Sequence, residues 1–371
     1  MNEIINLIEK EIKKITKKII FENKKLNTIV YTTSDLYLND LKNFSKTFNS
    51  LFKDSCNNNI LETYIIHNDN IFQKALIVLK NDKLSQTNGI INFNNATVNT
   101  SQAKCSNDYN YYIIKCYEYF IYIFDKKNKK CFMIIKKNKK VITMINILIL
   151  TPYLLYGELF AVHGGLVNKN NKNILINNSS LGGKTTFAIL FASNGWDIIT
   201  EETTYITNTG LILPYNIRNY FNIRVGTYLN FFDYFKCKNI IIDEFIQMKE
   251  KNSDELFDYG KKAQVSIDFE RIGKFKSLVS NYITSSLKVS IDKQQKFELV
   301  KCSPIENVNS FLELSLAPTV LLFKELLNFN NININERKKK LELIFNKTKS
   351  FKLNSGFDYK EKFNVIEKNI K

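Results

Sequence analysis

The sequence predicts a mixed α/β protein built from two domains, and three observations lead to this prediction. The chain has 371 residues, enough for one large or two ordinary domains, and its 44% hydrophobic content excludes a disordered chain. The first 140 residues show mostly short strand patterns around one or two helices. From residue 159, strands alternate with a glycine-containing loop and a helix. We therefore expect an α/β domain with a mixed sheet in residues 141–371, preceded by a smaller α+β domain in residues 1–140.

Hydrophobic spacing predicts the elements of the N-terminal domain. Isoleucines recur at intervals of three and four in residues 3–20, which predicts one amphipathic helix surrounded by lysines. A basic helix of this kind can lie on anionic lipid, but its interleaved glutamates favour a packed surface helix. Three strands are expected at residues 27–32, 62–67 and 74–80, and a hairpin at 111–136 with its turn at 125–130.

The apolar stretch at residues 139–158 predicts a helix. Its length approaches that of a membrane span, but Asn146, Pro152 and Glu158 interrupt it. We expect a buried helix at the domain junction and no membrane span. The N-terminus has acids among its bases and no continuous apolar run, so we expect no signal peptide and a cytoplasmic location.

The charge and the cysteines limit the classes of partner. Lys and Arg number 53 against 36 Asp and Glu, a net charge of +17 that usually suggests nucleic acid or an anionic membrane. However, the chain has only four arginines, and its richness in Lys, Asn and Ile is typical of an A/T-rich genome. The shortage of arginine disfavours a nucleic-acid reader. Six widely spaced cysteines and two histidines indicate neither a zinc module nor a disulfide framework.

The second domain is expected to begin with strands that enclose a loop and a helix. Strands are predicted at 159–167, 174–178 and 196–206, with a helix from 187 between the last two. The C-terminal part adds strands at 286–291 and 296–302 and helices near 304–328 and 335–347.

The loop between the second strand and the helix reads NSSLGGKTT, residues 178–186. A phosphate-binding loop needs glycines that turn backbone N–H groups onto phosphate oxygens, a lysine for the β- and γ-phosphates, and a neighbouring hydroxyl for Mg²⁺. Asn178 stands where the G-x-x-x-x-G-K-[ST] pattern begins with glycine; asparagine is the non-glycine residue best able to adopt a positive φ, and Gly182 adds local freedom. The alternative is a chance GGKTT at a helix start. The expected phosphate-binding residues are Ser179, Ser180, Leu181, Gly182, Gly183, Lys184, Thr185 and Thr186.

Acidic and basic residues flank this loop in the sequence. Glu201 and Glu202 follow an apolar strand, where two adjacent carboxylates are costly unless they bind a cation or take up a proton. A solvated strand end is the alternative. His163 precedes the loop, either as a catalytic residue or as a core histidine. Arg218 and Arg224 come soon after the acidic pair and suggest clamps on transferring phosphate oxygens.

The order of these features in residues 161–206 resembles that of the HPr kinase/phosphorylase-like kinases, which are related to the nucleotide site of phosphoenolpyruvate carboxykinase. That family's loop reads G-x-S-G-x-G-K-[ST], which Ser180, Gly183, Lys184 and Thr185 match, while Asn178 and Leu181 replace glycines. His163 matches the family's H-[AG] histidine, and its acidic pair, usually Asp-Asp, falls on Glu201 and Glu202. The family's Pro-aromatic-x-x-Arg stretch looks like Pro214, Tyr215 and Arg218, with Arg224 closing the segment.

The resemblance covers roughly residues 140–225, and residues 351–370 look like the family's terminal strand and helix. The R-G-[LIV]-G-[IVL] segment of bifunctional HPr kinase/phosphorylases does not occur in the sequence. The resemblance therefore points to relatives that act on other acceptors, including peptides and natural-product intermediates. Such relatives often form assemblies, but nothing in the sequence predicts a symmetry.

The resemblance implies an ATP-dependent kinase that uses Mg²⁺ and phosphorylates a hydroxyl of a small molecule or peptide. The implied catalytic residues are His163, Lys184, Glu201, Glu202, Arg218 and Arg224. Thr185 and Glu202 are the expected cation ligands with Glu201 as base, although the division of these roles between the two glutamates stays open. Two alternatives remain, a nucleotide-binding regulatory protein without phosphotransfer and a basic binder of nucleic acid or membrane surfaces.

Overall fold

The computed structural model describes most of the chain. The described residues are 2–15, 17–21, 27–33, 35, 38–49, 60–81, 85–93, 96–105, 108–116, 119–125, 127–136, 142–155, 159–178, 182–214, 220–248, 263–273, 282–292, 294–306 and 334–370. They form two compact units, one within residues 2–155 and one within residues 159–370. Both units combine helices with sheets that contain parallel and antiparallel strands, so the predicted mixed α/β class is confirmed.

The first unit is built on an eight-stranded mixed sheet. In spatial order its strands are β1 (Lys17–Phe21), β2 (Asn27–Thr32), β3 (Ile60–His67), β8 (Lys130–Ile135), β7 (Phe120–Asp125), β6 (Asp108–Cys116), β5 (Ala96–Cys105) and β4 (Ser85–Phe93). The pairs β2–β3 and β3–β8 are parallel, and the remaining pairs are antiparallel. The predicted hairpin turn at 125–130 joins β7 to β8.

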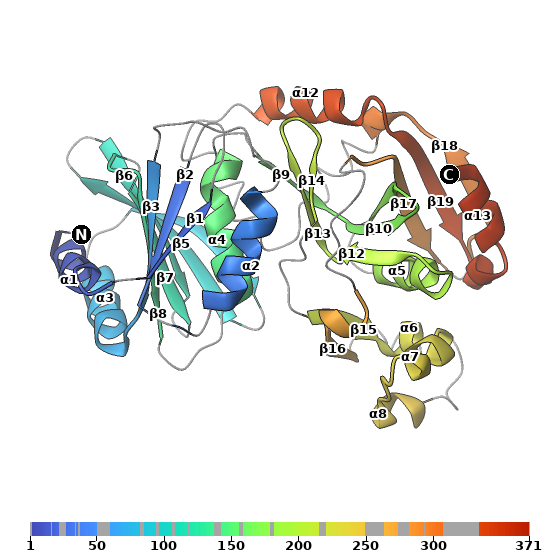
Figure 1. The fold of residues 1–371 in the computed structure, drawn as a ribbon, viewed down its shortest axis with the longest axis horizontal. Coiled ribbons are helices and arrows are strands. Elements are labelled where there is room, and N and C mark those ends of the chain that lie inside the picture. The colour runs from blue at the N-terminus through green and yellow to red at the C-terminus, as the bar shows by residue number, and fades with distance from the viewer. Residues whose placement is uncertain are drawn as a thin grey trace. The chain divides into compact units, whose positions relative to one another are not determined.

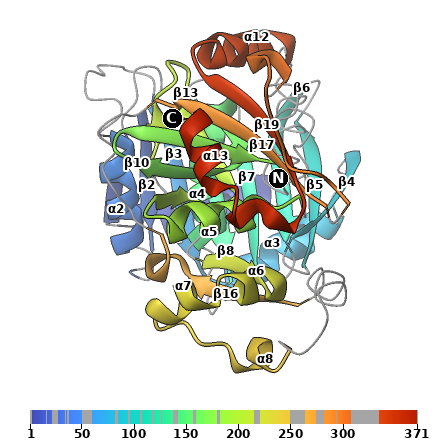
Figure 2. The same ribbon diagram turned by 90° about the vertical axis from the view of Figure 1, so that its right-hand side faces the viewer.

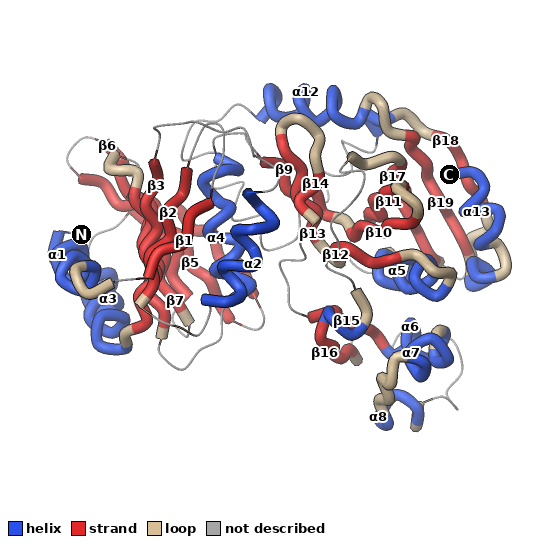
Figure 3. Tube along the Cα trace, in the orientation of Figure 1, coloured by secondary structure: helices blue, strands red, loops and turns tan. Residues whose placement is uncertain are grey.

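Helices cover both faces of this sheet, as Figures 1 and 3 show. On one face lie α1 (Asn2–Ile12) and α3 (Asp69–Asn81), and on the other lie α2 (Leu38–Asn49) and α4 (Ile142–Leu155). Ile4 of α1 and Phe72 of α3 share one apolar cluster with Ile134 of β8. On the opposite face the rings of Phe48 and Tyr153 pack 4.7 Å apart, so each helix buries its apolar side against the sheet.

Two predictions in this unit are wrong. The predicted helix at 3–20 ends at Ile12, because residues 17–21 alternate between exposed and buried side chains and pair with β2 as a strand. The predicted strand at 74–80 belongs to α3. Its buried residues recur at helical spacing, and the Asn68 side chain caps the helix by accepting hydrogen bonds from the N–H groups of residues 70 and 71 at 3.0 and 3.2 Å.

The boundary between the units differs from the one predicted after residue 140. It falls after residue 158, because α4 packs with the first unit. Tyr153 of α4 donates a hydrogen bond to the carbonyl oxygen of Phe21 at 3.2 Å. The buried helix predicted at 139–158 is therefore present, as the last element of the first unit. Within the described part of the chain, no helix is both long and apolar enough to cross a membrane.

The second unit contains a six-stranded mixed sheet. In spatial order its strands are β12 (Asp197–Thr200), β10 (Gly165–Lys169), β11 (Lys172–Asn177), β17 (Ser285–Ile291), β19 (Lys349–Ser355) and β18 (Glu298–Lys301). The pairs β11–β17 and β17–β19 are parallel. Because β10 is antiparallel to both β11 and β12, β12 runs in the same direction as β11. The carboxyl ends of β12, β11, β17 and β19 therefore share one edge of the sheet.

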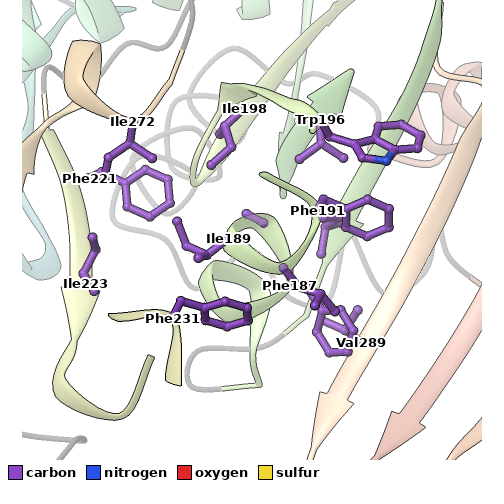
Figure 4. Close-up of a cluster of buried hydrophobic side chains, with 14 of the residues drawn as sticks. Phe187, Ile189, Phe191, Trp196, Ile198, Phe221, Ile223, Phe231, Ile272 and Val289 are labelled. Carbon is purple, nitrogen blue, oxygen red and sulfur yellow. The ribbon is translucent and has the colours of Figure 1, made fainter. Parts of the chain in front are cut away.

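Two layers cover this sheet. The face seen in Figure 2 carries α5 (Lys184–Ser193) and α13 (Phe363–Ile370), whose apolar side chains join the cluster of Figure 4. The same cluster includes residues of β15 (Tyr220–Arg224), β16 (Gln264–Asp268), α6 (Val225–Asn230), α7 (Phe232–Cys237), α8 (Asp243–Ile246) and the short 3₁₀ helices Phe269–Arg271 and Phe357–Lys360. The other face packs against a small sheet of β14 (Ile212–Leu213), β13 (Thr203–Thr207) and β9 (Leu159–His163), together with α12 (Ile334–Phe345).

Two strands predicted in this unit are each divided in two. Residues 159–167 form β9 and β10 with a break at Gly164, and residues 196–206 form β12 and β13 with a break at Glu201 and Glu202. Each break carries the chain from one sheet to the other. The strands predicted at 174–178, 286–291 and 296–302 and the terminal strand and helix are confirmed. The helix predicted at 304–328 begins at 304–306, and the rest of it lies outside the described residues.

Removal of the Phe191 ring is expected to destabilise the second unit by ~3–5 kcal/mol. This side chain of α5 is fully buried and packs edge to face with Trp196 and Phe363, at 5.1 and 5.3 Å between ring centres. The free energy of unfolding of Phe191→Ala can be measured in urea by fluorescence of Trp196, the protein's single tryptophan. Leu343→Ala is the control, because Leu343 is 70% exposed and its loss should change stability by less than about 0.5 kcal/mol.

Candidate functional site

The glycine-containing loop leaves the carboxyl end of β11 and leads into α5. The described part of the loop comprises Asn178, Gly182 and Gly183, and α5 begins at Lys184. Of the residues expected to bind phosphate, Ser179, Ser180 and Leu181 lie outside the described residues. The strand, loop and helix therefore follow one another as predicted, with the amino terminus of a ten-residue helix at the edge of the sheet.

Gly183 occupies a position that only glycine suits. Its φ of +97° lies in the left-handed region, and it caps the amino terminus of α5. A Cβ atom there would lie 2.6 Å from Cδ1 of Ile291 at the end of β17. The backbone is therefore held close to the neighbouring strand, and the next residue, Lys184, starts the helix.

Asn178, at the first position of the loop, does not use the positive φ that asparagine tolerates. Its side chain instead closes the loop by hydrogen bonding. Nδ2 of Asn178 donates to the carbonyl oxygen of Gly182 at 2.9 Å and to that of Val289 in β17. A Cβ atom on Gly182 would lie 1.7 Å from the same Nδ2, so Gly182 leaves the space that this amide fills. The Asn178 side chain, rather than an unusual backbone conformation, therefore restrains the start of the loop.

Lys184 and His163 are in direct contact. Nζ of Lys184 lies 2.9 Å from Nε2 of His163 and donates a hydrogen bond to the carbonyl oxygen of Asn178 at 2.9 Å. A lysine ammonium can only donate, so Nε2 accepts this bond and the ring proton of a neutral His163 is on Nδ1. His163 is 5% exposed at the end of β9. The structure thus brings together two residues that are 21 positions apart in sequence, as the site prediction requires.

The two sheet crossings explain how His163 and Glu201 reach the loop. His163 pairs with Thr203, and Leu166, just after the break, pairs with Thr200. A Cβ atom on Gly165 would lie only 2.7 Å from the carbonyl oxygen of Glu201, so a glycine is needed where the crossings pass each other. The breaks therefore lie side by side at the amino end of β10, at the same sheet edge as the loop.

Hydroxyl groups hold these crossings together. Thr204 Oγ1 donates to the carbonyl oxygen of Gly164 at 2.8 Å, and the hydroxyls of Thr200 and Thr204 lie 2.7 Å apart. These threonines were not among the predicted site residues, and their only signal in the sequence is the run of threonines around the two glutamates. Thr200 and Thr204 therefore hold the two crossings, at Gly164 and at Glu201 and Glu202, in position.

Thr185 lies next to Glu201. Its Oγ1 donates to Oε1 of Glu201 over 3.4 Å, and Glu201 is 9% exposed. This arrangement differs from the expectation that Thr185 shares a cation with Glu202. Glu202, in the same break, is half-buried. No cluster of three or more His, Cys, Asp and Glu side chains is present in the described part of the chain.

The predicted arginines are only partly described. Arg224 ends β15 and stands at the amino terminus of α6, where its partial burial lowers the pKa of its guanidinium. The hydroxyls of Thr186 and Thr227 lie 2.9 Å apart and join the first turns of α5 and α6, so the start of α6 lies beside the candidate site. Pro214 follows β14 and is buried, whereas Tyr215 and Arg218 lie outside the described residues.

Comparison with known proteins adds no assignment. The sequence matches no family model, and a search of curated proteins finds no match. The site is therefore interpreted from its own residues.

Alanine at Gly183 should destabilise the protein more than alanine at Gly195. Both glycines have positive φ, +97° and +82°, which costs an alanine ~1–2 kcal/mol. Only Gly183→Ala also forces a Cβ atom against Ile291, whereas the nearest atom to a Cβ at Gly195 is Nζ of Lys169 at 3.6 Å. Urea unfolding followed by circular dichroism checks the difference, and equal losses of stability would contradict the close packing at Gly183.

Proposed function

We propose that the second unit is an HPr-kinase-like P-loop domain and that the protein is an ATP-dependent kinase acting on a hydroxyl group. The acceptor would be a small molecule, a natural-product intermediate or a peptide. The observation that carries this proposal is the convergence of Lys184, His163 and Glu201 at the amino terminus of α5. A strand, a glycine turn and a helix amino terminus form the scaffold of a phosphate site, and lysine, hydroxyl and carboxylate are the groups that phosphoryl transfer uses.

The loop and the start of α5 would bind the phosphates. Backbone N–H groups at a helix amino terminus carry partial positive charge and stabilise anions there. The contact of Lys184 with His163 holds its ammonium at the loop, 2.9 Å from the carbonyl oxygen of Asn178. In the proposed complex, Lys184 would turn toward the β- and γ-phosphates of ATP, and His163 would keep it oriented.

Thr185 and Glu201 fit a magnesium ion. A hydroxyl and a carboxylate from neighbouring elements are oxygen donors of the type that Mg²⁺ prefers, and phosphates and water supply its other ligands. Their oxygens lie 3.4 Å apart, close enough for both to bind one cation. Bound Mg²⁺ would neutralise the charge that develops on the phosphate oxygens. We therefore reverse the assignment made from the sequence and give Glu201, rather than Glu202, to the cation.

Glu202 would act as the base. It is adjacent to Glu201 in the break between β12 and β13 and is more exposed, so a substrate hydroxyl can reach it more easily. As the acceptor oxygen forms its bond to the γ-phosphorus and the bond to the ADP oxygen breaks, Glu202 takes the hydroxyl proton. Arg224 and Arg218 would stabilise the charge on the transferred group.

Transfer from radiolabelled ATP into an extract of the source cells tests this function. We expect label in a compound identified by mass spectrometry, and no transfer after Mg²⁺ is removed by a chelator. Binding of ATP without any transfer would contradict the kinase and favour a regulatory nucleotide-binding protein. Strong salt-dependent binding of DNA or RNA in the absence of ATP would favour the basic binder.

A further inference from the structure

Two lysines occupy paired positions on neighbouring strands beside the candidate site, and their side chains extend from the same face of the sheet. Lys288 of β17 is directly opposite Lys352 of β19 in the parallel register. Lys288 is half-buried and Lys352 is exposed. Like charges directly opposite each other in a sheet are destabilising. Neither lysine forms an ion pair with any residue that the structure describes, so no direct ion pair offsets the repulsion between them.

This lysine pair lies one strand away from the phosphate loop. Lys288 is also paired with Asn177, the last residue of β11, and the next residue, Asn178, bonds through its side chain to the carbonyl oxygen of Val289. Neighbouring strands lie ~4.8 Å apart. Lys288 is therefore within a few ångströms of the residue whose carbonyl oxygen accepts a hydrogen bond from Lys184.

Both lysines lie on the sheet face opposite α5. The side chains of Leu287 and Val289 join the apolar cluster around α5, so the alternating residue Lys288 faces the other side, and Lys352 follows the same rule between Phe351 and Leu353. This is the face on which β9 packs, farther along the same sheet. His163 of β9 and the lysine pair therefore approach the loop from the same side of the sheet.

Polar and acidic groups also lie on the side of the pair away from the loop. Asn354 of β19 donates to Oε2 of Glu298 at 3.2 Å, and Val300 stands opposite Lys352 on β18. Burial raises the pKa of the Cys302 thiol, and so does the charge of Glu306, while the charges of Lys288 and Lys352 lower it. Acidic groups thus flank the pair from β18 and from the helical residues 304–306, and Lys288 lies nearer the loop.

We propose that Lys288 and Lys352 bind an anionic group of the phosphate acceptor, a carboxylate or a phosphate ester, and so select a hydroxyl compound that is also an acid. This inference rests on the proposed kinase function. A bound anion would replace the repulsion between the two ammonium groups with attraction to both. It would hold the acceptor on the lysines' face of the sheet, so that its hydroxyl extends toward the loop.

Anion titration of the purified protein tests the lysine pair directly. We would measure binding of malonate and of inorganic phosphate by calorimetry, with Lys184→Ala as the background so that the phosphate loop itself contributes little. Saturable binding of one anion per chain is expected, with at least about tenfold weaker binding when Lys288→Gln and Lys352→Gln are combined. Comparison of the two anions shows whether the pair prefers a carboxylate or a phosphate.

Lys301→Gln is the matched control. Lys301 is exposed on the adjacent strand β18, but it pairs with Phe351 and so faces the α5 side of the sheet. Its substitution removes one positive charge and should leave anion binding unchanged. Equal weakening by Lys301→Gln, or unchanged binding in the double variant, would overturn the proposal.

The acceptor itself is tested by fractionating the cell extract into neutral and acidic pools by anion exchange. Label from ATP is expected only in compounds of the acidic pool, and the double variant should raise the KM for the acceptor far more than it changes kcat. A labelled neutral acceptor would overturn the inference and leave the kinase function intact. Absence of transfer from both pools would contradict the kinase function, while the titration would still decide whether the lysine pair binds anions.

Discussion

Substitution of Lys184 by alanine is expected to slow ATP-dependent phosphoryl transfer by about 10³-fold. The ammonium of Lys184 lies at the amino terminus of α5, in contact with His163 and the loop carbonyl of Asn178. In a phosphoryl-transfer site most of the rate arises from fixed charges placed around the transferring group, because little covalent chemistry is left to the protein. The measurement is kcat for transfer of label from ATP to the acceptor.

Two further variants make the Lys184 result specific. Lys347→Ala removes an exposed lysine of the same unit and should retain the full rate. Lys184→Arg keeps the charge but replaces a compact ammonium with a planar fork, so its rate should fall between those of the wild type and the alanine variant. Full activity of Lys184→Ala would remove the phosphate-loop assignment, provided that circular dichroism shows both alanine variants to be folded.

Local sequence patterns were sufficient to predict the strand, loop and helix on which the candidate site is built. A strand, a glycine-containing loop and a helix are consecutive in the chain, and the left-handed φ of Gly183 needs only a residue without a Cβ atom. The proximity of Lys184, Thr185 and the loop follows from this short segment. Such features depend on neighbours in sequence, which is why spacing alone could predict them.

The sheet crossings could not be predicted in the same way. The apolar runs 159–167 and 196–206 each look like one strand, but each supplies one strand to the six-stranded sheet and one to the small sheet. The breaks at Gly164 and Glu201 depend on pairing between segments that are far apart in the chain. The same holds for Asn178, whose amide reaches a carbonyl oxygen 111 residues away in sequence.

The error at residues 74–80 has a different cause. This segment is rich in aliphatic residues, and a short apolar run is compatible with either a strand or a helix. Helical spacing of its buried residues becomes evident only from Asp69 onward, together with the cap at Asn68. The structure resolves the ambiguity because Phe72 and Leu79 lie on the same helix face against the sheet.

Exchange of each glutamate for glutamine should separate the two carboxylate roles. Glu201 accepts a hydrogen bond from Thr185 and is assigned to the cation, so Glu201→Gln is expected to raise the Mg²⁺ concentration needed for half-maximal rate by about 10–100-fold. Excess Mg²⁺ should then restore part of the rate. Glu202 is assigned to the hydroxyl proton, so Glu202→Gln should lower kcat by ~10²–10⁴-fold at every Mg²⁺ concentration.

The comparison is informative because glutamine has nearly the same size as glutamate and can still accept the bond from Thr185. Both variants are therefore expected to fold normally, and their thermal unfolding checks this. If instead Glu202→Gln raised the required Mg²⁺ concentration and Glu201→Gln lowered kcat at every Mg²⁺ concentration, the cation would be assigned to Glu202, as the sequence alone suggested. If both variants kept the wild-type rate and Mg²⁺ dependence, neither carboxylate would be needed to bind the cation or to take up the hydroxyl proton. The acidic pair would then have only a structural role.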